Sequence, residues 1–173
     1  MVGVSPLVSI IAPVFNEEAS ILELHRRIAA VVEGQPRYHF EMVYVDDGST
    51  DGTLEELRAI RMSDPRVRVV ELRRNFGQTP ALSAGLDAAH GAILITMDAD
   101  LQHFPEDIPR FLEGIEQGAD LVCGWRKNRR EGLVRRVPSL VANRMIRWIS
   151  GLDIHDFCTT FRAYRREILN DIP

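Results

Sequence analysis

The stretch Val43-Tyr44-Val45-Asp46-Asp47-Gly48-Ser49-Thr50-Asp51 decides the fold, together with a second one of the same design, Ile93-Leu94-Ile95-Thr96-Met97-Asp98-Ala99-Asp100-Leu101-Gln102. In each, a short apolar run ends in acidic residues. A short apolar run is typical of a strand buried in a parallel sheet, and ligands bind beyond the carboxyl ends of such strands. Carboxylates gathered there repel one another unless a cation or hydrogen-bond donors lie among them. The two stretches predict an α/β sheet with a binding site at one edge.

Strand and helix patterns alternate along the chain around these stretches. The predicted strands are residues 8–14, 42–45, 67–72, 92–97 and 120–124, and the predicted helices are residues 16–32, 53–62, 81–89 and 105–117. Thr50 or Asp51 is expected to cap the second helix, Gly91 to end the third, and a last helix to start near Tyr164. This rhythm predicts a mostly parallel central sheet flanked by helices, an α/β fold.

Composition fits one soluble globular domain. The chain has 173 residues, 45% of them hydrophobic and 27% charged. It contains no apolar run of about 18 residues and no signal-peptide pattern, so neither a membrane span nor secretion is expected. Cys123 and Cys158 lack metal-ligand spacing, and reduced thiols in the cytoplasm are the default interpretation.

Charge is distributed unevenly between two parts of the chain. Residues 1–123 carry 10 Lys+Arg and 20 Asp+Glu, whereas residues 124–173 carry 11 Lys+Arg and 5 Asp+Glu. The basic part is expected to meet an anion, or else to dock on the acidic part. Within it, residues 139–149 form a basic amphipathic helix that either lies in a membrane interface or packs on the core.

The acidic residues after the two strands have a chemistry of their own. In an extended segment Asp98, Asp100 and Gln102 project to one side, and their oxygens suit Mg²⁺ or Mn²⁺. Asp46 and Asp47 either form a turn and helix cap or accept hydrogen bonds from the base and ribose of a nucleotide. Together the two strand ends predict a site for a metal and a nucleotide.

Phosphate-binding glycine loops are absent. Neither G-x-G-x-x-G nor G-x-x-x-x-G-K-[ST] occurs, which disfavours dinucleotide oxidoreductases and P-loop NTPases. Phosphate charge would then be neutralised by the metal and by arginines. The candidate arginines are Arg73, Arg74, Arg126, Arg135 and Arg136.

Ordered motifs along nearly the whole chain carry a family resemblance. They are Pro13-Val14-Phe15-Asn16-Glu17-Glu18, Val45-Asp46-Asp47-Gly48-Ser49-Thr50-Asp51, Arg74-Asn75-Phe76-Gly77, Asp98-Ala99-Asp100-Leu101-Gln102, Gly124-Trp125-Arg126 and Phe161-Arg162-Ala163-Tyr164-Arg165-Arg166. The chain resembles the inverting family 2 glycosyltransferases of GT-A (Rossmann-like) fold. Within them it is most similar to the polyprenyl-phosphate branch, the dolichyl-phosphate mannose synthases and undecaprenyl-phosphate sugar transferases.

The resemblance implies a metal-dependent transfer of a hexosyl group from a UDP- or GDP-sugar to a polyprenyl phosphate. The implied residues are Pro13, Phe15, Glu17 and Asp46 or Asp47 for the nucleoside, Asp98, Asp100 and Gln102 for Mg²⁺ or Mn²⁺, Arg126, Arg135 and Ser139 for the lipid phosphate, and Asp100 and Asp156 for catalysis. At Thr160 the chain departs from the family, which has glycine there. Because a phosphate monoester is largely anionic at neutral pH, Asp156 is expected to orient rather than to accept a proton.

Two alternatives stay open, a polysaccharide or other hydroxyl acceptor and a non-catalytic module that binds nucleotide sugars. The basic second part favours an anionic acceptor, and no nucleic-acid partner is expected. The resemblance also implies a catalytic domain truncated at its C-terminus, with residues 1–123 on the donor side and 124–173 on the acceptor side. The full-length protein is expected at the inner face of the cytoplasmic membrane, and a homo-oligomer is left open.

Overall fold

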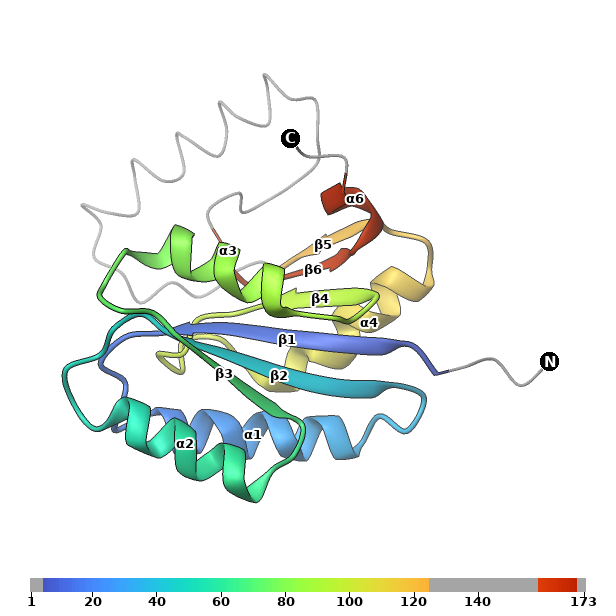
Figure 1. Ribbon diagram of the computed structural model, residues 1–173. Helices are drawn as coiled ribbons and strands as arrows, with labels where there is room; N and C mark the ends of the chain where they lie inside the picture. The colour runs from blue at the N-terminus through green and yellow to red at the C-terminus, as the bar shows by residue number, and fades with distance from the viewer. Residues whose placement is uncertain (1–4, 125–158, 171–173) are drawn as a thin grey trace, which may run out of the picture.

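A six-stranded sheet forms the centre of the computed structural model, which describes residues 5–124 and 159–170 (Figure 1). The strands are β1 (Leu7–Val14), β2 (His39–Asp46), β3 (Val67–Glu71), β4 (Ile93–Thr96), β5 (Leu121–Cys123) and β6 (Arg162–Arg165). The helices are α1 (Ile21–Glu33), α2 (Thr53–Ser63), α3 (Gln78–Ala88), the 3₁₀ turn η1 (Pro105–Asp107), α4 (Ile108–Glu116) and α6 (Glu167–Asn170).

The strands follow the order β3-β2-β1-β4-β6-β5, and the sheet is parallel except at β6. β1 pairs in parallel with both β2 and β4, and β2 pairs in parallel with β3. β6 runs antiparallel to its neighbours β4 and β5. The prediction of a mostly parallel sheet flanked by helices is therefore confirmed.

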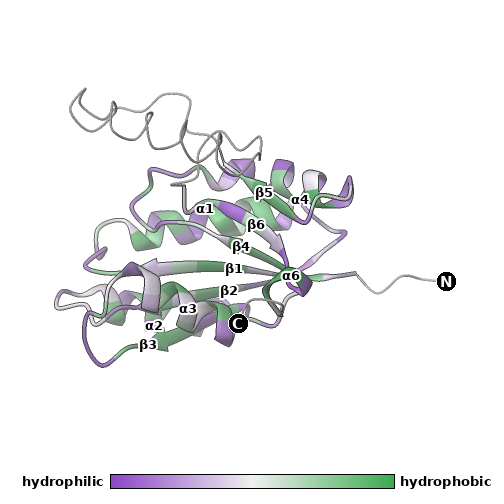
Figure 2. Ribbon diagram, turned by 90° about the horizontal axis from the view of Figure 1, so that it is seen from above, coloured by the Kyte–Doolittle hydropathy of each residue, from purple (hydrophilic) through white to green (hydrophobic). Residues whose placement is uncertain are grey.

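Alternating side chains on the strands build two apolar layers. On one face, Val8, Ile10, Ala12 and Val14 of β1 share a buried cluster with residues of α1, α2 and α4. On the other face, the strand residues Ile11, Val43 and Val45 pack with α3, which lies across the sheet from α1 and α2 (Figure 1). The central strands β1, β2 and β4 are accordingly apolar along most of their length (Figure 2). Successive side chains point to opposite faces, so a strand covered on both faces is apolar at nearly every position.

The close packing of α3 on the sheet depends on Gly85. A Cβ built at this position would lie 2.5 Å from Cγ2 of Ile11 and 3.0 Å from Cγ2 of Val45. A side chain there would push α3 away from β1 and β2. The glycine therefore sets the distance between the helix and the strands whose ends form the site.

The last helix is present, but its predicted start near Tyr164 is wrong. Tyr164 lies in β6 and pairs with Leu94 of β4 and Leu121 of β5, and the helix begins three residues later, at Glu167. A four-residue strand carries too little periodicity to be distinguished from helix by pattern alone. Its partners are distant in sequence, so only the assembled sheet identifies it.

Gly91 does not end α3. The helix stops at Ala88, and Ala89 has extended backbone geometry. Gly91 instead donates its N–H to Ser9 Oγ at 2.7 Å, and a Cβ at this position would lie 2.6 Å from the Ser9 nitrogen. The glycine is required by the close approach of two chain segments rather than by a helix end.

The helix predicted from residue 16 begins later, at Ile21. The expected cap of α2 is also shifted by a residue. Gly52 occupies the N-cap position, while Asp51 Oδ1 accepts the N–H of Thr53 at 3.1 Å. The acidic side chain thus contacts the first turn, as expected, from outside the capping position.

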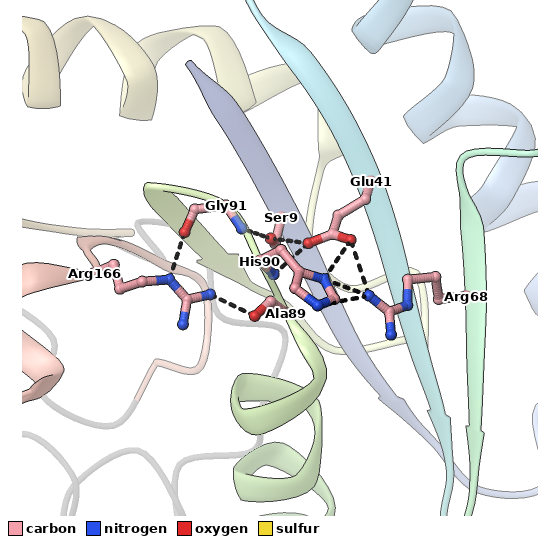
Figure 3. Close-up of polar contacts among 7 residues, drawn as sticks. All are labelled: Ser9, Glu41, Arg68, Ala89, His90, Gly91 and Arg166. Atoms are coloured by element: carbon pink, nitrogen blue, oxygen red, sulfur yellow. Dashed lines mark hydrogen bonds and ion pairs between the residues drawn. The ribbon is translucent and has the colours of Figure 1, made fainter.

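A polar cluster fixes the turn between α3 and β4 at the amino ends of the strands (Figure 3). Buried Glu41 accepts hydrogen bonds from Ser9 Oγ at 2.6 Å and from the His90 N–H at 2.5 Å, and Arg68 lies 3.6 Å from its other oxygen. From the opposite side, Arg166 donates to the carbonyls of Gly91 and Ala89 at 2.7 and 2.6 Å. The start of β4 is therefore held from both sides.

Among the described residues, no helix combines the length and the apolar character needed to cross a bilayer.

Candidate functional site

A cavity of about 430 Å³ opens at the carboxyl edge of the sheet. Its walls come from the segments that follow β1, β2, β3 and β4, so four separate parts of the chain meet there. Six of the residues predicted for nucleotide or metal line it, namely Pro13, Phe15, Glu17, Asp47, Asp98 and Asp100. The topology thus gathers most of the predicted donor site into one place, as expected for the carboxyl ends of parallel strands.

Asp98 follows the end of β4, and both its backbone N–H and its carboxylate form hydrogen bonds. The last ladder bond runs from the Met97 N–H to the Ile11 carbonyl at 3.0 Å. The next N–H, that of Asp98, donates to His103 Nδ1 at 3.1 Å, and the Gln78 amide donates to Asp98 Oδ1 at 2.7 Å. Asp98 is therefore oriented by residues from two different segments.

The segment after β4 is not extended. β4 ends at Thr96, and Leu101 has a φ of 60°, in the left-handed region. The expectation that alternation places Asp98, Asp100 and Gln102 on one side is therefore wrong in its premise. Gln102 is exposed and does not line the cavity, while its N–H donates to Asp100 Oδ1 at 3.0 Å. The metal-ligand assignment of the three residues stays a prediction.

Asp47 fastens the segment after β3 to the end of β2. Its side chain is buried, and its two carboxylate oxygens accept the N–H groups of Phe76 and Gly77 at 2.8 and 2.9 Å. Gly77 has a φ of 94°, a conformation that favours glycine. Asp47 thereby places Gln78, the first residue of α3, at the cavity wall.

Asp46 is a buried carboxylate with incomplete hydrogen bonding. It is 1% exposed and is not part of the cavity lining. Oδ2 accepts the Ser49 N–H at 3.3 Å, while no donor among residues 5–124 and 159–170 reaches Oδ1. A buried acceptor without a partner costs about 1–3 kcal/mol, and more when it is charged. A functional role for Asp46 explains why the protein tolerates this free-energy cost next to the cavity.

The segments after β1 and β2 are joined by reciprocal hydrogen bonds. Asn16, with a φ of 55°, donates its N–H to Ser49 Oγ at 3.0 Å and accepts the Thr50 N–H on Oδ1 at 2.8 Å. Glu17 donates its N–H to Thr53 Oγ1 at 2.8 Å. Asn16 therefore joins two loops rather than starting α1, and these bonds fix the wall that carries Phe15 and Glu17.

Five cavity residues have no role assigned from the sequence, and three of them, Asn75, Gly77 and Gln78, come from the segment after β3. Asn75 and Gly77 belong to the motif Arg74-Asn75-Phe76-Gly77, but the sequence alone gives neither residue a role. Their position directly after a strand was the available signal, because every segment that follows a parallel strand opens at the same edge.

The oxygen donors at the cavity fit a small divalent cation. Within the described ranges no group of three or more His, Cys, Asp or Glu side chains is placed to hold a metal by itself. Mg²⁺ and similar ions are commonly held by one or two carboxylates together with substrate phosphates and waters. Asp98 and Asp100 line one cavity, and each has a second oxygen besides the one that accepts the bonds above. This donor set matches that mode of binding.

Several predicted residues lie outside the described part of the chain. They are Arg126, Arg135, Arg136, Ser139 and Asp156, together with the expected amphipathic helix at 139–149. Arg73 and Arg74 are described and exposed, and the Arg74 guanidinium lies 4.8 Å from the centre of the Phe76 ring. The predicted phosphate contacts of all these residues remain predictions.

Comparison with known proteins gives concordant matches. The family model described as glycosyl transferase family 2 matches residues 9–173. A dodecaprenyl-phosphate galacturonate synthase of Rhizobium johnstonii is 44% identical over 167 residues, 95% of this chain and 49% of that protein. An undecaprenyl-phosphate 4-deoxy-4-formamido-L-arabinose transferase of Pseudomonas paraeruginosa is 46% identical over 94% of this chain and 48% of its own length. The chain thus spans about half the length of these relatives.

Solved structures confirm the predicted fold. Glucosyl-3-phosphoglycerate synthase of Mycobacterium tuberculosis, in complex with Mn²⁺, UDP-glucose and phosphoglyceric acid, matches with a TM-score of 0.75 and 27% identity over 97% of this chain and 60% of that chain. A mannosyltransferase of Pyrobaculum calidifontis, in complex with GDP-Man and Mn²⁺, matches with a TM-score of 0.69 and 23% identity over 96% and 46%. At that identity the second match bears on the fold alone.

Proposed function

The chain belongs to glycosyl transferase family 2, and on this premise we propose that it carries the donor site of an inverting glycosyltransferase. The reaction moves a hexosyl group from a UDP- or GDP-sugar to a polyprenyl phosphate, with Mg²⁺ or Mn²⁺. The observation that carries the acceptor class is that both curated relatives above, at 44 and 46% identity, have names that specify a sugar and a polyprenyl phosphate. The reaction is assigned to the inner face of the cytoplasmic membrane, where a polyprenyl-phosphate acceptor lies.

Each described side chain at the cavity has a part in binding the donor. Pro13, Phe15 and Glu17 form the wall assigned to the nucleoside. Asp46 lies buried behind this lining, with one carboxylate oxygen that no donor among the described residues reaches, and is assigned to the nucleoside as well. Asp98 and Asp100 are assigned to the cation. When bound, that cation screens the charge of the leaving diphosphate. Gln78 and Asp47 orient the residues that contact these groups.

The acceptor determines whether the protein needs a general base. A phosphate monoester has a second pKa of about 6 and is already nucleophilic at neutral pH. A hydroxyl acceptor has to lose its proton during the attack, so it requires a positioned base. For a polyprenyl phosphate we therefore assign Asp156 an orienting role, and Asp156→Asn is expected to slow turnover less than Asp100→Ala does.

The donor assignment is tested by calorimetric titration of UDP, GDP and their sugar conjugates in Mn²⁺, in Mg²⁺ and in EDTA. One nucleotide is expected to bind, only in the presence of metal, and Asp100→Ala is expected to abolish that binding. Asp87→Ala changes an exposed acid on α3, away from the cavity lining, and serves as the matched control. Unchanged metal-dependent binding by Asp100→Ala would refute the metal assignment.

The acceptor assignment is tested with a short-chain polyprenyl phosphate, the corresponding polyprenol without phosphate, and no acceptor. Formation of a sugar-phosphate lipid is followed by mass spectrometry. Product with the phosphate alone supports the proposal, and product with the polyprenol indicates a hydroxyl acceptor instead. If the protein binds the donor but neither transfers the sugar nor hydrolyses the donor under any condition, it is a binding module.

A further inference from the structure

His103 is a buried polar residue that contacts Asp98 but has no part in the proposed binding of the donor or the cation. It lies between β4 and η1, and it is 4% exposed. Its Nδ1 accepts the Asp98 N–H at 3.1 Å, so a neutral ring carries its proton on Nε2. That second nitrogen lies 3.8 Å from Asp98 Oδ2. Both ring nitrogens therefore face the same residue, one toward its backbone and one toward its carboxylate.

An aromatic stack holds the His103 ring in this position. The ring is stacked on Phe161 with 5.2 Å between centroids and 26° between planes, and Phe161 is stacked on Phe111 at 4.3 Å and 30°. Phe161 and Phe111 are each 5% exposed. The stack therefore spans from α4, through the residue that precedes β6, to the segment that carries Asp98.

The backbone around Phe161 is anchored on both sides. Its carbonyl accepts the Gly124 N–H at 2.9 Å, next to the end of β5. The preceding carbonyl, that of Thr160, accepts the hydroxyl of Thr96 at 2.6 Å, and Thr96 is the last residue of β4. The Phe161 residue on which His103 stacks is thus bonded to β4, the strand that Asp98 follows.

From these contacts we infer that His103 is a positioning residue, which orients Asp98 toward the cation and is itself held by Phe161. The inference rests on the proposed function, because it takes Asp98 as a metal ligand. Among residues 5–124 and 159–170, no ladder hydrogen bond beyond that of Met97 constrains Asp98, so its direction depends on the side chains that contact it. Partners of this kind, outside the ligands themselves, commonly change metal affinity 10- to 100-fold when they are replaced.

Two substitutions separate the hydrogen bond from the stack. His103→Phe keeps an aromatic ring on Phe161 but removes the acceptor, and His103→Leu repeats the loss of the acceptor with a smaller side chain if the phenylalanine does not fit. His103→Asn removes the ring but places an amide oxygen near the position of Nδ1. Phe111→Leu is the matched control, since it removes the ring contact between Phe111 and Phe161 and keeps both the Phe161 ring and the His103 side chain.

The measurement is the Mn²⁺ dissociation constant, obtained from the electron paramagnetic resonance signal of free Mn²⁺ with the 173-residue chain, alone and with UDP or GDP. His103→Phe is expected to raise the constant by about 10-fold or more. His103→Asn is expected to restore most of the affinity. Phe111→Leu is expected to lower the melting temperature while leaving the constant at the wild-type value.

Wild-type affinity in His103→Phe and His103→Leu, or equal losses in His103→Asn and His103→Phe, would overturn the inference. Asp98→Ala shows which proposal has failed. If Asp98→Ala loses Mn²⁺ and the His103 variants do not, only the positioning role is wrong. If Asp98→Ala binds Mn²⁺ as the wild type does, the metal assignment of the proposed function is wrong, and the inference falls with it.

Discussion

The side-chain amide of Gln78 donates a 2.7 Å hydrogen bond to Asp98 Oδ1, joining the first residue of α3 to the segment that follows β4. The two residues are 20 positions apart, and both line the cavity at the carboxyl edge. A change at Gln78 therefore acts on Asp98 without altering the carboxylate itself. Gln78 is exposed, so a substitution there is compatible with folding.

Gln78→Glu is expected to make stability depend more strongly on Mn²⁺. Without metal, a third carboxylate beside Asp98 and Asp100 lowers the melting temperature by about 1–2 °C. With metal, the added oxygen ligand makes the Mn²⁺-induced rise in melting temperature larger than that of the wild type. Thermal unfolding with and without Mn²⁺ measures both effects.

Thr79→Glu is the control for Gln78→Glu. Thr79 is the next residue of α3 and is also exposed, so both glutamates gain the same favourable interaction with the helix N-terminus. If the two variants respond equally to Mn²⁺, the contact between Gln78 and Asp98 does not operate in solution.

Asp47→Asn is expected to lower the free energy of unfolding by about 1–3 kcal/mol. The asparagine amide nitrogen has to face one of the two N–H groups, of Phe76 or Gly77, that the carboxylate now accepts. Nucleotide affinity should fall as well, because Gln78 moves with this segment. Urea denaturation gives the first quantity and calorimetry the second. Asp87→Asn, an exposed change on α3, should stay within about 0.5 kcal/mol of the wild type.

Asp46→Asn is expected to raise the free energy of unfolding by about 1 kcal/mol, because it replaces a buried charged oxygen that lacks a donor among the described residues with a neutral group. The same change should weaken nucleotide binding. Asp51→Asn is the contrast, since the Asp51 carboxylate accepts the N–H groups of Thr53 and Glu18 and its loss should destabilise the fold. Destabilisation by Asp46→Asn would mean that the buried oxygen is satisfied in the folded protein.

Glu41 should contribute stability that disappears in acid. Burial alone would raise the pKa of Glu41, but hydrogen bonds from Ser9 and His90 outweigh it and hold the pKa below its ordinary value of 4.5. Arg68, from β3, is the remaining charged group that faces this carboxylate. A lowered folded-state pKa gives stability that is fully present above the unfolded-state pKa. It is lost as the pH falls below about 4.5 and through the folded-state value.

The check is the pH dependence of the difference in unfolding free energy between the wild type and Glu41→Gln. The wild-type advantage should be constant near neutral pH and should shrink below about pH 4.5. Glu55→Gln, an exposed change on α2, should show no such trend over the same range. A difference that is independent of pH would mean that the Glu41 carboxylate is not responsible.

The edge of the sheet that carries the cavity could be predicted because its signals are local. Asp98 follows a short apolar strand, and so does Asp47; parallel strands present their carboxyl ends together. The premise of an extended segment at Asp98, by contrast, was wrong, since Leu101 turns the chain with a positive φ. A single backbone angle of this kind does not change the hydrophobic periodicity of the sequence, so the sequence pattern does not reveal it.

Other errors came from contacts between distant segments. Tyr164 was predicted to begin a helix because its four-residue strand is recognisable only when β4 and β5 lie on either side of it. The sequence pattern indicates a helix end at Gly91, whereas the structure shows that the close approach of Ser9 requires the glycine. The contribution of Gln78 was missed for the same reason, because its partner Asp98 belongs to another strand end.

By itself the sequence determined the alternation of strands and helices, the edge of the sheet at which the cavity lies and the acidic residues placed there. These follow from hydrophobic period and from the short-range preference of each segment, which act along neighbouring residues. The tertiary structure alone decided the antiparallel strand β6, the Asp46 oxygen that no donor among the described residues reaches, and the way Gln78 and His103 converge on Asp98. Such features depend on contacts between side chains that are distant in sequence. Packing sets the geometry of these contacts only when all the strands of the sheet are paired.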